Sequence, residues 1–97
     1  MKTKAAFIHW THPRHESSLL PIGIEYFPHI VRENDPAKEH WSIRFQITEE
    51  NQKVRGPINL SMLLDNDMAF AYFDTLTSGT KFILLEGNTE VARGYIL

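Results

Sequence analysis

Three histidines near the N-terminus recur at every third residue: His9, His12 and His15. Neutral imidazoles are the commonest protein ligands of zinc and copper, so this run is the first place to look for a metal site. Pro13 prevents a regular helix here, and a strand would turn His12 to the face opposite the other two rings. The rings could still converge in a loop, but no closed ligand spacing is present, so we predict neither a metal ion nor a cofactor.

Serines and carboxylates are the other residues that could do chemistry. The available serines are Ser17, Ser18, Ser61 and Ser78. None lies between two glycines in the elbow that exposes a nucleophilic hydroxyl, so surface and cap positions explain them. Asp65, Asp67 and Asp74 could supply an acid and a base, but Asp65 to Asp67 is typical of a turn held by side-chain to backbone hydrogen bonds. The sequence therefore predicts no catalytic residues.

The segment from Thr11 to Leu20 carries side chains suited to recognition. Arg14 offers a planar guanidinium to a carboxylate or phosphate, and His12 and His15 gain charge as the pH falls. Trp10 precedes this loop, and large aromatic side chains dominate many binding interfaces, although burial in the core is the alternative for this ring. We predict that Trp10, His12, Arg14 and His15 contact a partner. Further candidate anchors are Tyr26, Trp41 and Tyr72.

Composition limits the class of protein. The 97 residues are 42% hydrophobic and 11% aromatic, which suits one domain spanning residues 1–97. Cysteine is absent, so disulfides and thiolate metal sites are excluded. A formal charge of −2 has the wrong sign for general attraction to a phosphate backbone, so RNA ranks below protein as a partner. The apolar run behind the basic N-terminus is interrupted from His9 onward, too early for a signal peptide or membrane span, and this predicts a cytoplasmic location.

Short apolar stretches predict an all-β fold. The clearest is Trp41 to Thr48, where Trp41, Ile43, Phe45 and Ile47 alternate with polar residues. Other strands are expected at 5–10, 58–64, 81–85 and 91–97, and the last two are joined by a hairpin that turns at Gly87 and Asn88. Pro21 and Pro28 restrict residues 19–31 to edge or bulged strands. Phe45 and Phe82 are predicted to anchor the core.

Residues 68–76 fit two structures. Three aromatic residues, Phe70, Tyr72 and Phe73, favour a strand. A helical stripe is the open alternative, formed by Met68, Ala69, Ala71 and Tyr72. We favour the strand, and six or seven short strands at this spacing fit a small antiparallel β-barrel or sandwich.

The C-terminal hairpin resembles the end of the C-terminal β-barrel domain of elongation factor Tu. The matching residues are Gly79, Lys81, Phe82, Glu86, Gly87, Val91, Gly94 and Ile96. Ala92 stands where that family usually has glycine, and Leu85 where it often has arginine. Upstream, Arg14 with His15, and Gly23 to Phe27 with Pro28, resemble the family's arginine-histidine loop and the stretch after it, whose arginine is absent here.

This resemblance implies a free-standing antiparallel barrel of about six strands. Elongation factor Tu uses its barrel to pack on a GTPase domain and to touch the backbone of aminoacyl-tRNA. No glycine-rich phosphate loop is present in this chain, so no nucleotide is expected.

Three functional hypotheses follow. The leading one is a non-catalytic binding module with a protein partner, which uses the loop from Thr11 to Leu20 and the neighbouring strand edges. The second is a small acidic inhibitor or immunity-type protein that plugs a basic enzyme site with Asp65, Asp67 and Asp74. The third is a histidine-dependent metal enzyme with its site in the same loop.

Overall fold

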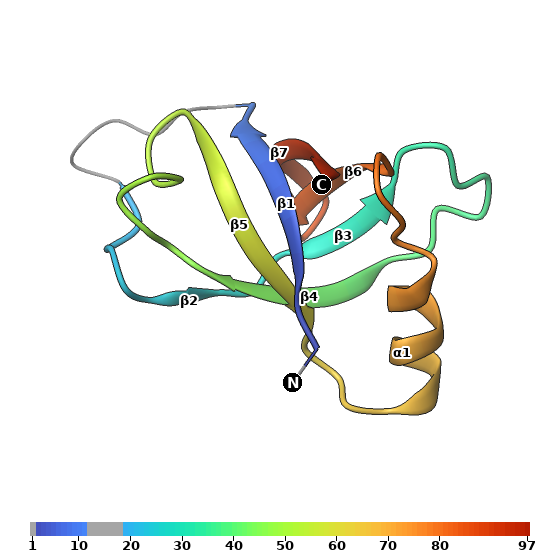
Figure 1. The fold of residues 1–97 in the computed structure, drawn as a ribbon. Coiled ribbons are helices and arrows are strands. Elements are labelled where there is room, and N and C mark those ends of the chain that lie inside the picture. The colour runs from blue at the N-terminus through green and yellow to red at the C-terminus, as the bar shows by residue number, and fades with distance from the viewer. Residues whose placement is uncertain (1, 12–18) are drawn as a thin grey trace.

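A computed structural model describes residues 2–11 and 19–97. It contains seven strands and one helix (Figure 1). The strands are β1 (Lys4–Trp10), β2 (Glu25–Tyr26), β3 (His29–Arg32), β4 (Trp41–Gln46), β5 (Arg55–Met62), β6 (Lys81–Glu86) and β7 (Thr89–Ile96). The helix is α1 (Asp67–Asp74). Along the described residues, no helix is long and apolar enough to cross a membrane.

Six strands close into an antiparallel barrel, as predicted. Their order is β4, β3, β6, β7, β1 and β5, and β5 returns to β4 by pairing Met62 with Ile43 and Ser61 with Arg44. Closure leaves these strands without the long unpaired edges that invite aggregation. The short strand β2 continues the line of β3 and pairs with β4 through Tyr26 and Phe45.

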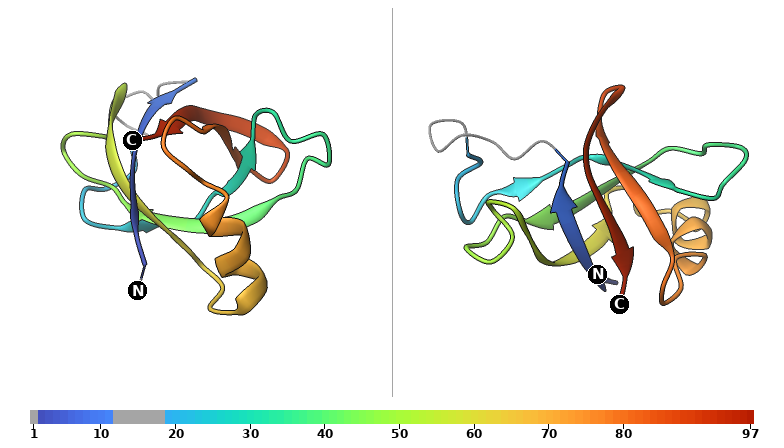
Figure 2. Two further views of the ribbon diagram at one scale, coloured as in Figure 1. Left: turned by 45° about the vertical axis from the view of Figure 1, so that its right-hand side comes forward. Right: turned by 90° about the horizontal axis from the view of Figure 1, so that it is seen from above.

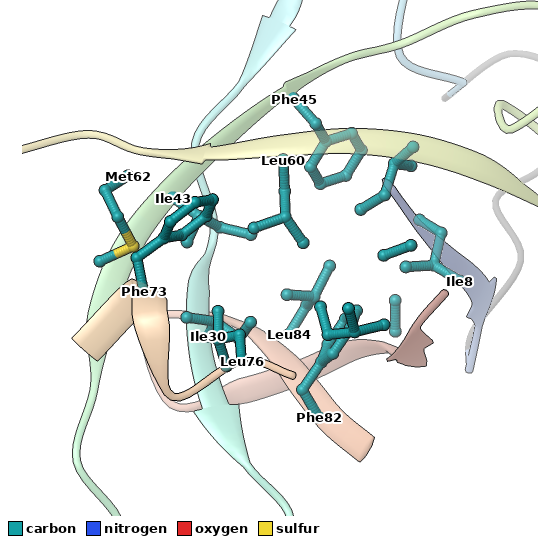
Figure 3. Close-up of a cluster of buried hydrophobic side chains, with 14 of the residues drawn as sticks. Ile8, Ile30, Ile43, Phe45, Leu60, Met62, Phe73, Leu76, Phe82 and Leu84 are labelled. Atoms are coloured by element: carbon teal, nitrogen blue, oxygen red, sulfur yellow. The ribbon is translucent and has the colours of Figure 1, made fainter. Parts of the chain in front are cut away.

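The barrel interior is filled by side chains from alternate positions of each strand (Figure 3). On β4 and just beyond it, Ile43, Phe45 and Ile47 are buried, and Trp41 is half-buried. Phe82 of β6 is fully buried, so the two predicted anchors, Phe45 and Phe82, both lie in the core. The alternation of apolar and polar residues predicted these buried faces correctly, because only one face of each strand points into the barrel.

The prediction that residues 19–31 form only edge or bulged strands was wrong for the second half of this segment. Pro28 separates β2 from β3, and β3 then pairs with β4 on one side and β6 on the other. It is thus an internal strand of the barrel. The proline is tolerated because it precedes the strand, where its carbonyl accepts a 3.0 Å hydrogen bond from the backbone N–H of Ile43.

The segment of uncertain type is the helix α1. Asn66 caps its N-terminus, accepting a 2.9 Å hydrogen bond from the backbone N–H of Ala69. The buried stripe runs through Ala69, Tyr72, Phe73 and Leu76, which has the i, i+3, i+4, i+7 spacing of one helix face. Met68, which was expected in the stripe, is 72% exposed. Burial of this stripe in the end of the barrel outweighs the strand preference of the aromatic residues.

Lys4 of β1 ties α1 to the barrel. Its ammonium donates to the carbonyls of Phe73 and Leu76, at 2.6 and 2.8 Å, and lies 4.6 Å from the centre of the Phe73 ring. A cation is favourable at these carbonyls because the C-terminus of a helix carries partial negative charge. Figure 3 shows Phe73 and Leu76 pointing into the barrel beside Met62 and Ile30, so the helix closes that end.

The last hairpin turns at Gly87 and Asn88 between β6 and β7, as predicted. Gly87 has φ of 59°, a conformation that glycine adopts without strain. Gly94 is required for a different reason, because a Cβ there would lie 2.3 Å from the carbonyl oxygen of Phe7 on β1.

Candidate functional site

Of the four predicted contact residues, three lie outside the described part of the chain: His12, Arg14 and His15. The fourth, Trp10, belongs to the core, and its side chain is 7% exposed. Its indole N–H donates a 2.6 Å hydrogen bond to the carbonyl of Asn51, and its ring packs 5.8 Å from that of Tyr26. The structural role of Trp10 is thus visible, whereas contact with a partner stays a prediction for all four residues.

Asn51 holds the loop between β4 and β5, a stretch that the sequence had marked only as a polar connection. Its side chain is fully buried. The amide nitrogen donates to the carbonyls of Gln46 and Pro57, each at 3.1 Å, and the amide oxygen accepts from the N–H of Thr48 at 3.0 Å. Together with the bond from Trp10, these contacts fix the loop against two strands.

No group of three histidine, cysteine, aspartate or glutamate side chains converges as a metal site in residues 2–11 and 19–97. His9 is exposed on β1, and the rings of His29 and His40 lie 6.3 Å apart. Asp65, Asp67 and Asp74 are exposed along α1 and the turn before it. Exposed apolar side chains and surface grooves of the described residues are therefore the features from which we infer a function.

Two stretches of the chain each carry three exposed, large apolar side chains. The segments that contain them, around β2 and at the start of α1, lie on opposite sides of the barrel in Figure 2. One stretch flanks β2 and comprises Ile22, Ile24 and Phe27. The other leads from β5 into α1 and comprises Leu63, Leu64 and Met68. Exposed apolar groups with a polar surround are typical of sites where other proteins bind.

The β5–α1 stretch borders a cavity of 470 Å³, called the corner cavity below. Its apolar lining is Met62, Leu63, Leu64, Phe70 and Phe73, and its charged lining is Lys2, Arg44 and Asp65. Arg44 donates to the hydroxyl of Ser61 at 3.2 Å, which holds the guanidinium beside β5. The lining of the cavity therefore combines apolar side chains with charges of both signs.

The opposite flank of α1 forms a second groove, of 320 Å³, called the aromatic groove below. It is lined by Arg32, Glu39, Trp41, Met68, Ala71, Tyr72 and Thr75. Trp41 and Tyr72 stack with ring centres 5.5 Å apart, and the guanidinium of Arg32 lies over the Tyr72 ring at 5.5 Å. In Figure 1, α1 and the loop between β3 and β4 lie on the same side of the barrel.

Three polar atoms in this groove are buried without a hydrogen-bond partner among the described residues: Nε of Arg32, Nε1 of Trp41 and Oη of Tyr72. The Tyr72 side chain is 4% exposed, and burial raises the pKa of its phenol to about 12. An unmade hydrogen bond at a buried polar atom costs about 1–3 kcal/mol. All three atoms are covered by neighbouring protein atoms, and the guanidinium of Arg32 is the nearest charged group that acts on the Tyr72 phenol.

Asp35 anchors the loop beside the groove. Its carboxylate accepts from the backbone N–H groups of Ala37 and Glu39, at 3.0 and 3.2 Å, and lies 3.6 Å from the guanidinium of Arg32. The bond from Glu39 is the largest influence that lowers the pKa of Asp35. A further cavity, of 490 Å³, extends from here past Thr75 and Lys81.

The sequence identified Trp41 and Tyr72 as candidate anchors but could not place them together. Tyr72 reaches Trp41 only because residues 67–74 are helical, and a strand would have pointed it elsewhere. Arg32 and Met68 carried no signal of a site. Comparison with known proteins adds no relative: no family model, no curated protein and no solved structure matches this chain.

Proposed function

We propose that this chain is a non-catalytic module that binds another protein, and that its docking surface is centred on the corner cavity between β5 and α1. The observation that carries the proposal is the exposure of Leu63 and Leu64 in the lining of a 470 Å³ cavity to which Met62, Phe70 and Phe73 also contribute. A partner that inserts an apolar side chain there would remove these groups from water, at about 25 cal/mol for each Å² buried.

The charges around the cavity favour a protein partner over RNA. Lys2 and Arg44 are accompanied by Asp65 in the lining, so positive charge is not concentrated as a phosphate backbone requires. The same mixture weakens the alternative of an acidic inhibitor, because Asp65 does not act in a uniformly negative surface. Mixed charge around an apolar centre is the usual composition of a protein interface.

The resemblance of the C-terminal hairpin to the elongation factor Tu barrel supports the same class of function. In that family the barrel binds other macromolecules and carries no chemistry of its own. We propose this chain as a relative of that barrel.

The test is selection of ligands from a displayed peptide library on the immobilised protein, followed by affinity measurement. We expect selected peptides to carry apolar residues, and the double variant Leu63→Asp, Leu64→Asp to weaken them at least about 10-fold. Val54→Asp is the matched control, since Val54 is also exposed but lies just before the other end of β5. Failure to select any peptide, or equal losses in the variant and the control, would contradict the proposal.

A further inference from the structure

The charged residues of the corner cavity give that surface a preference for one sign of ligand charge. Two cations, Lys2 and Arg44, stand against one acid, Asp65, in the lining. A third cation nearby, Lys4, is engaged with two backbone carbonyls at the end of α1. The lining therefore favours a ligand with a single negative charge.

Lys2 is the cation that is best placed to meet this charge. Its side chain is exposed, and its ammonium lies 5.8 Å from the centre of the Phe70 ring, which lines the same cavity. The attraction between an ammonium and a ring face favours this position beside the apolar lining. Lys2 forms no ion pair within residues 2–11 and 19–97, so a ligand carboxylate would not displace an acidic partner.

Apolar side chains lie within reach of this ammonium. Leu63 is 42% exposed and Leu64 is 50% exposed, and both line the cavity together with the half-buried Phe70. The cavity volume of 470 Å³ is within the range of pockets that enclose a small ligand or a peptide end. The surface therefore favours a group in which an apolar side chain and a carboxylate are close together.

The C-terminal residue of a protein chain has this arrangement. Its side chain and its α-carboxylate are attached to the same Cα, so one residue can occupy the apolar lining and reach Lys2. An aspartate or glutamate within a chain needs a neighbouring residue to supply the apolar group, and the chain must continue past the cavity in both directions. A phosphorylated residue carries close to two negative charges, which is more than the lining balances.

We propose that the corner cavity binds the C-terminus of a partner protein that ends in a large apolar residue. The apolar side chain contacts Leu63 and Leu64, and the α-carboxylate pairs with Lys2, as in other modules that capture a chain terminus. Arg44 adds to the positive potential, and Asp65 disfavours a second acidic residue next to the terminus. This inference rests on the proposed function, because it names the ligand of the same surface.

The experiment is an NMR titration of the ¹⁵N-labelled protein with a synthetic hexapeptide that ends in leucine and has a free α-carboxylate. The backbone amide resonances of Leu63 and Leu64 should shift. Those of Gly87 and Asn88 should stay in place, because this turn follows the end of β6 that lies beside β2.

Two ligand controls test which carboxylate is recognised. The same hexapeptide with a C-terminal amide lacks the charge and should bind at least about 5-fold more weakly, since charged hydrogen bonds are the stronger ones. An amidated hexapeptide with aspartate before its leucine carries the charge within the chain. It should bind no better than the first amide, and affinity equal to that of the free acid would overturn the inference.

The variant Lys2→Glu reverses the charge that the proposal assigns to the carboxylate. In this variant the free acid and the amide should bind with a ratio of affinities near one. Lys53→Glu is the matched control, because it makes the same change of net charge at an exposed residue of the loop between β4 and β5, outside the cavity lining. It should keep the preference for the free acid, and thermal unfolding verifies that both variants are folded. Equal affinities of acid and amide for the native protein, or an undiminished preference in Lys2→Glu, would contradict the proposal.

The two proposals fail separately. If library peptides depend on Leu63 and Leu64 while acid and amide forms bind equally, the docking surface stands and the inference of a C-terminal ligand falls. If the free acid is preferred through Lys2 while the Leu63 and Leu64 variant binds it as the native protein does, recognition of the carboxylate stands and the apolar docking surface falls.

Discussion

Replacing the buried side chain of Asn51 tests how the long loop between β4 and β5 is held. Asn51→Ala removes two hydrogen bonds donated to Gln46 and Pro57 and one accepted from Thr48. At about 1 kcal/mol for each bond, the free energy of unfolding should fall by about 3 kcal/mol. That is a large fraction of the roughly 5–15 kcal/mol that is typical of small domains.

The assay is urea unfolding followed by tryptophan fluorescence. With a urea dependence of about 1.5 kcal/mol per molar, the transition midpoint should move down by about 2 M. The same probe reports locally, because Trp10 donates to the backbone carbonyl of Asn51 and its emission should shift to the red if the loop opens. Asn59→Ala is the matched control, since Asn59 is exposed on β5 and should change stability by about 0.5 kcal/mol or less.

A loss below about 1 kcal/mol for Asn51→Ala, with unchanged Trp10 emission, would refute this account of the loop. It would mean that solvent replaces the amide as a partner for the three backbone groups. Asn51→Asp discriminates further. The carboxylate keeps the acceptor for Thr48 but sets a negative oxygen against the carbonyls of Gln46 and Pro57, so it should be no more stable than the alanine variant.

Three further predictions concern the helix and the barrel. Lys4→Met should lower the thermal unfolding temperature more than Lys2→Met, because only Lys4 donates to the carbonyls of Phe73 and Leu76; equal shifts would contradict the role of Lys4 as a cap. Gly94→Ala should be strongly destabilised in urea, because its Cβ would lie 2.3 Å from the Phe7 carbonyl, whereas Gly23→Ala meets no atom within 4 Å and suffers only from its positive φ. In an alkaline absorbance titration, one tyrosine should ionise near pH 12, and this transition should be absent from Tyr72→Phe. Because the pKa of Tyr72 is higher in the folded protein than in the unfolded chain, its contribution to the free energy of unfolding is complete below about pH 10 and is lost between about pH 10 and 12.

Alternation along the strands was readable from the sequence because each strand of the barrel has one face inside and one outside. Ile43, Phe45 and Ile47 repeat with a period of two, and every one of them is buried. The turn at Gly87 and Asn88 was readable for a local reason as well, since glycine adopts the positive φ that a two-residue hairpin needs. Barrel closure itself joins strands that are distant in sequence, and it was suggested by the number and spacing of the strands together with the family resemblance of the last hairpin.

The helix could not be read in the same way because its two signals conflict. The aromatic side chains of Phe70, Tyr72 and Phe73 favour a strand. The spacing of Ala69, Tyr72, Phe73 and Leu76 favours a helix. The open end of the barrel decides between them, since a helix presents all four of the latter residues to one side and a strand would divide them. That end of the barrel is bordered by Lys4 of β1, Ile30 of β3, Ile43 of β4 and Met62 of β5, so no local window of sequence contains it.

Position 28 shows a second limit of local reasoning. A proline removes one backbone donor, and the sequence offers no way to know whether a neighbouring strand needs that donor. Here Pro28 lies between β2 and β3, and its carbonyl accepts a hydrogen bond from the backbone N–H of Ile43. β3 therefore pairs with β4 on one side and with β6 on the other despite the proline. The cost falls on β2, which is reduced to two residues paired only with β4.

The position of Tyr72 connects the stability of the barrel with the aromatic groove. Tyr72 belongs to the core cluster, and its ring also stacks with that of Trp41 and lies beneath the guanidinium of Arg32. Because the helix closes the barrel only when Tyr72 and Phe73 are buried together, any ligand that binds the folded groove also stabilises the closed end.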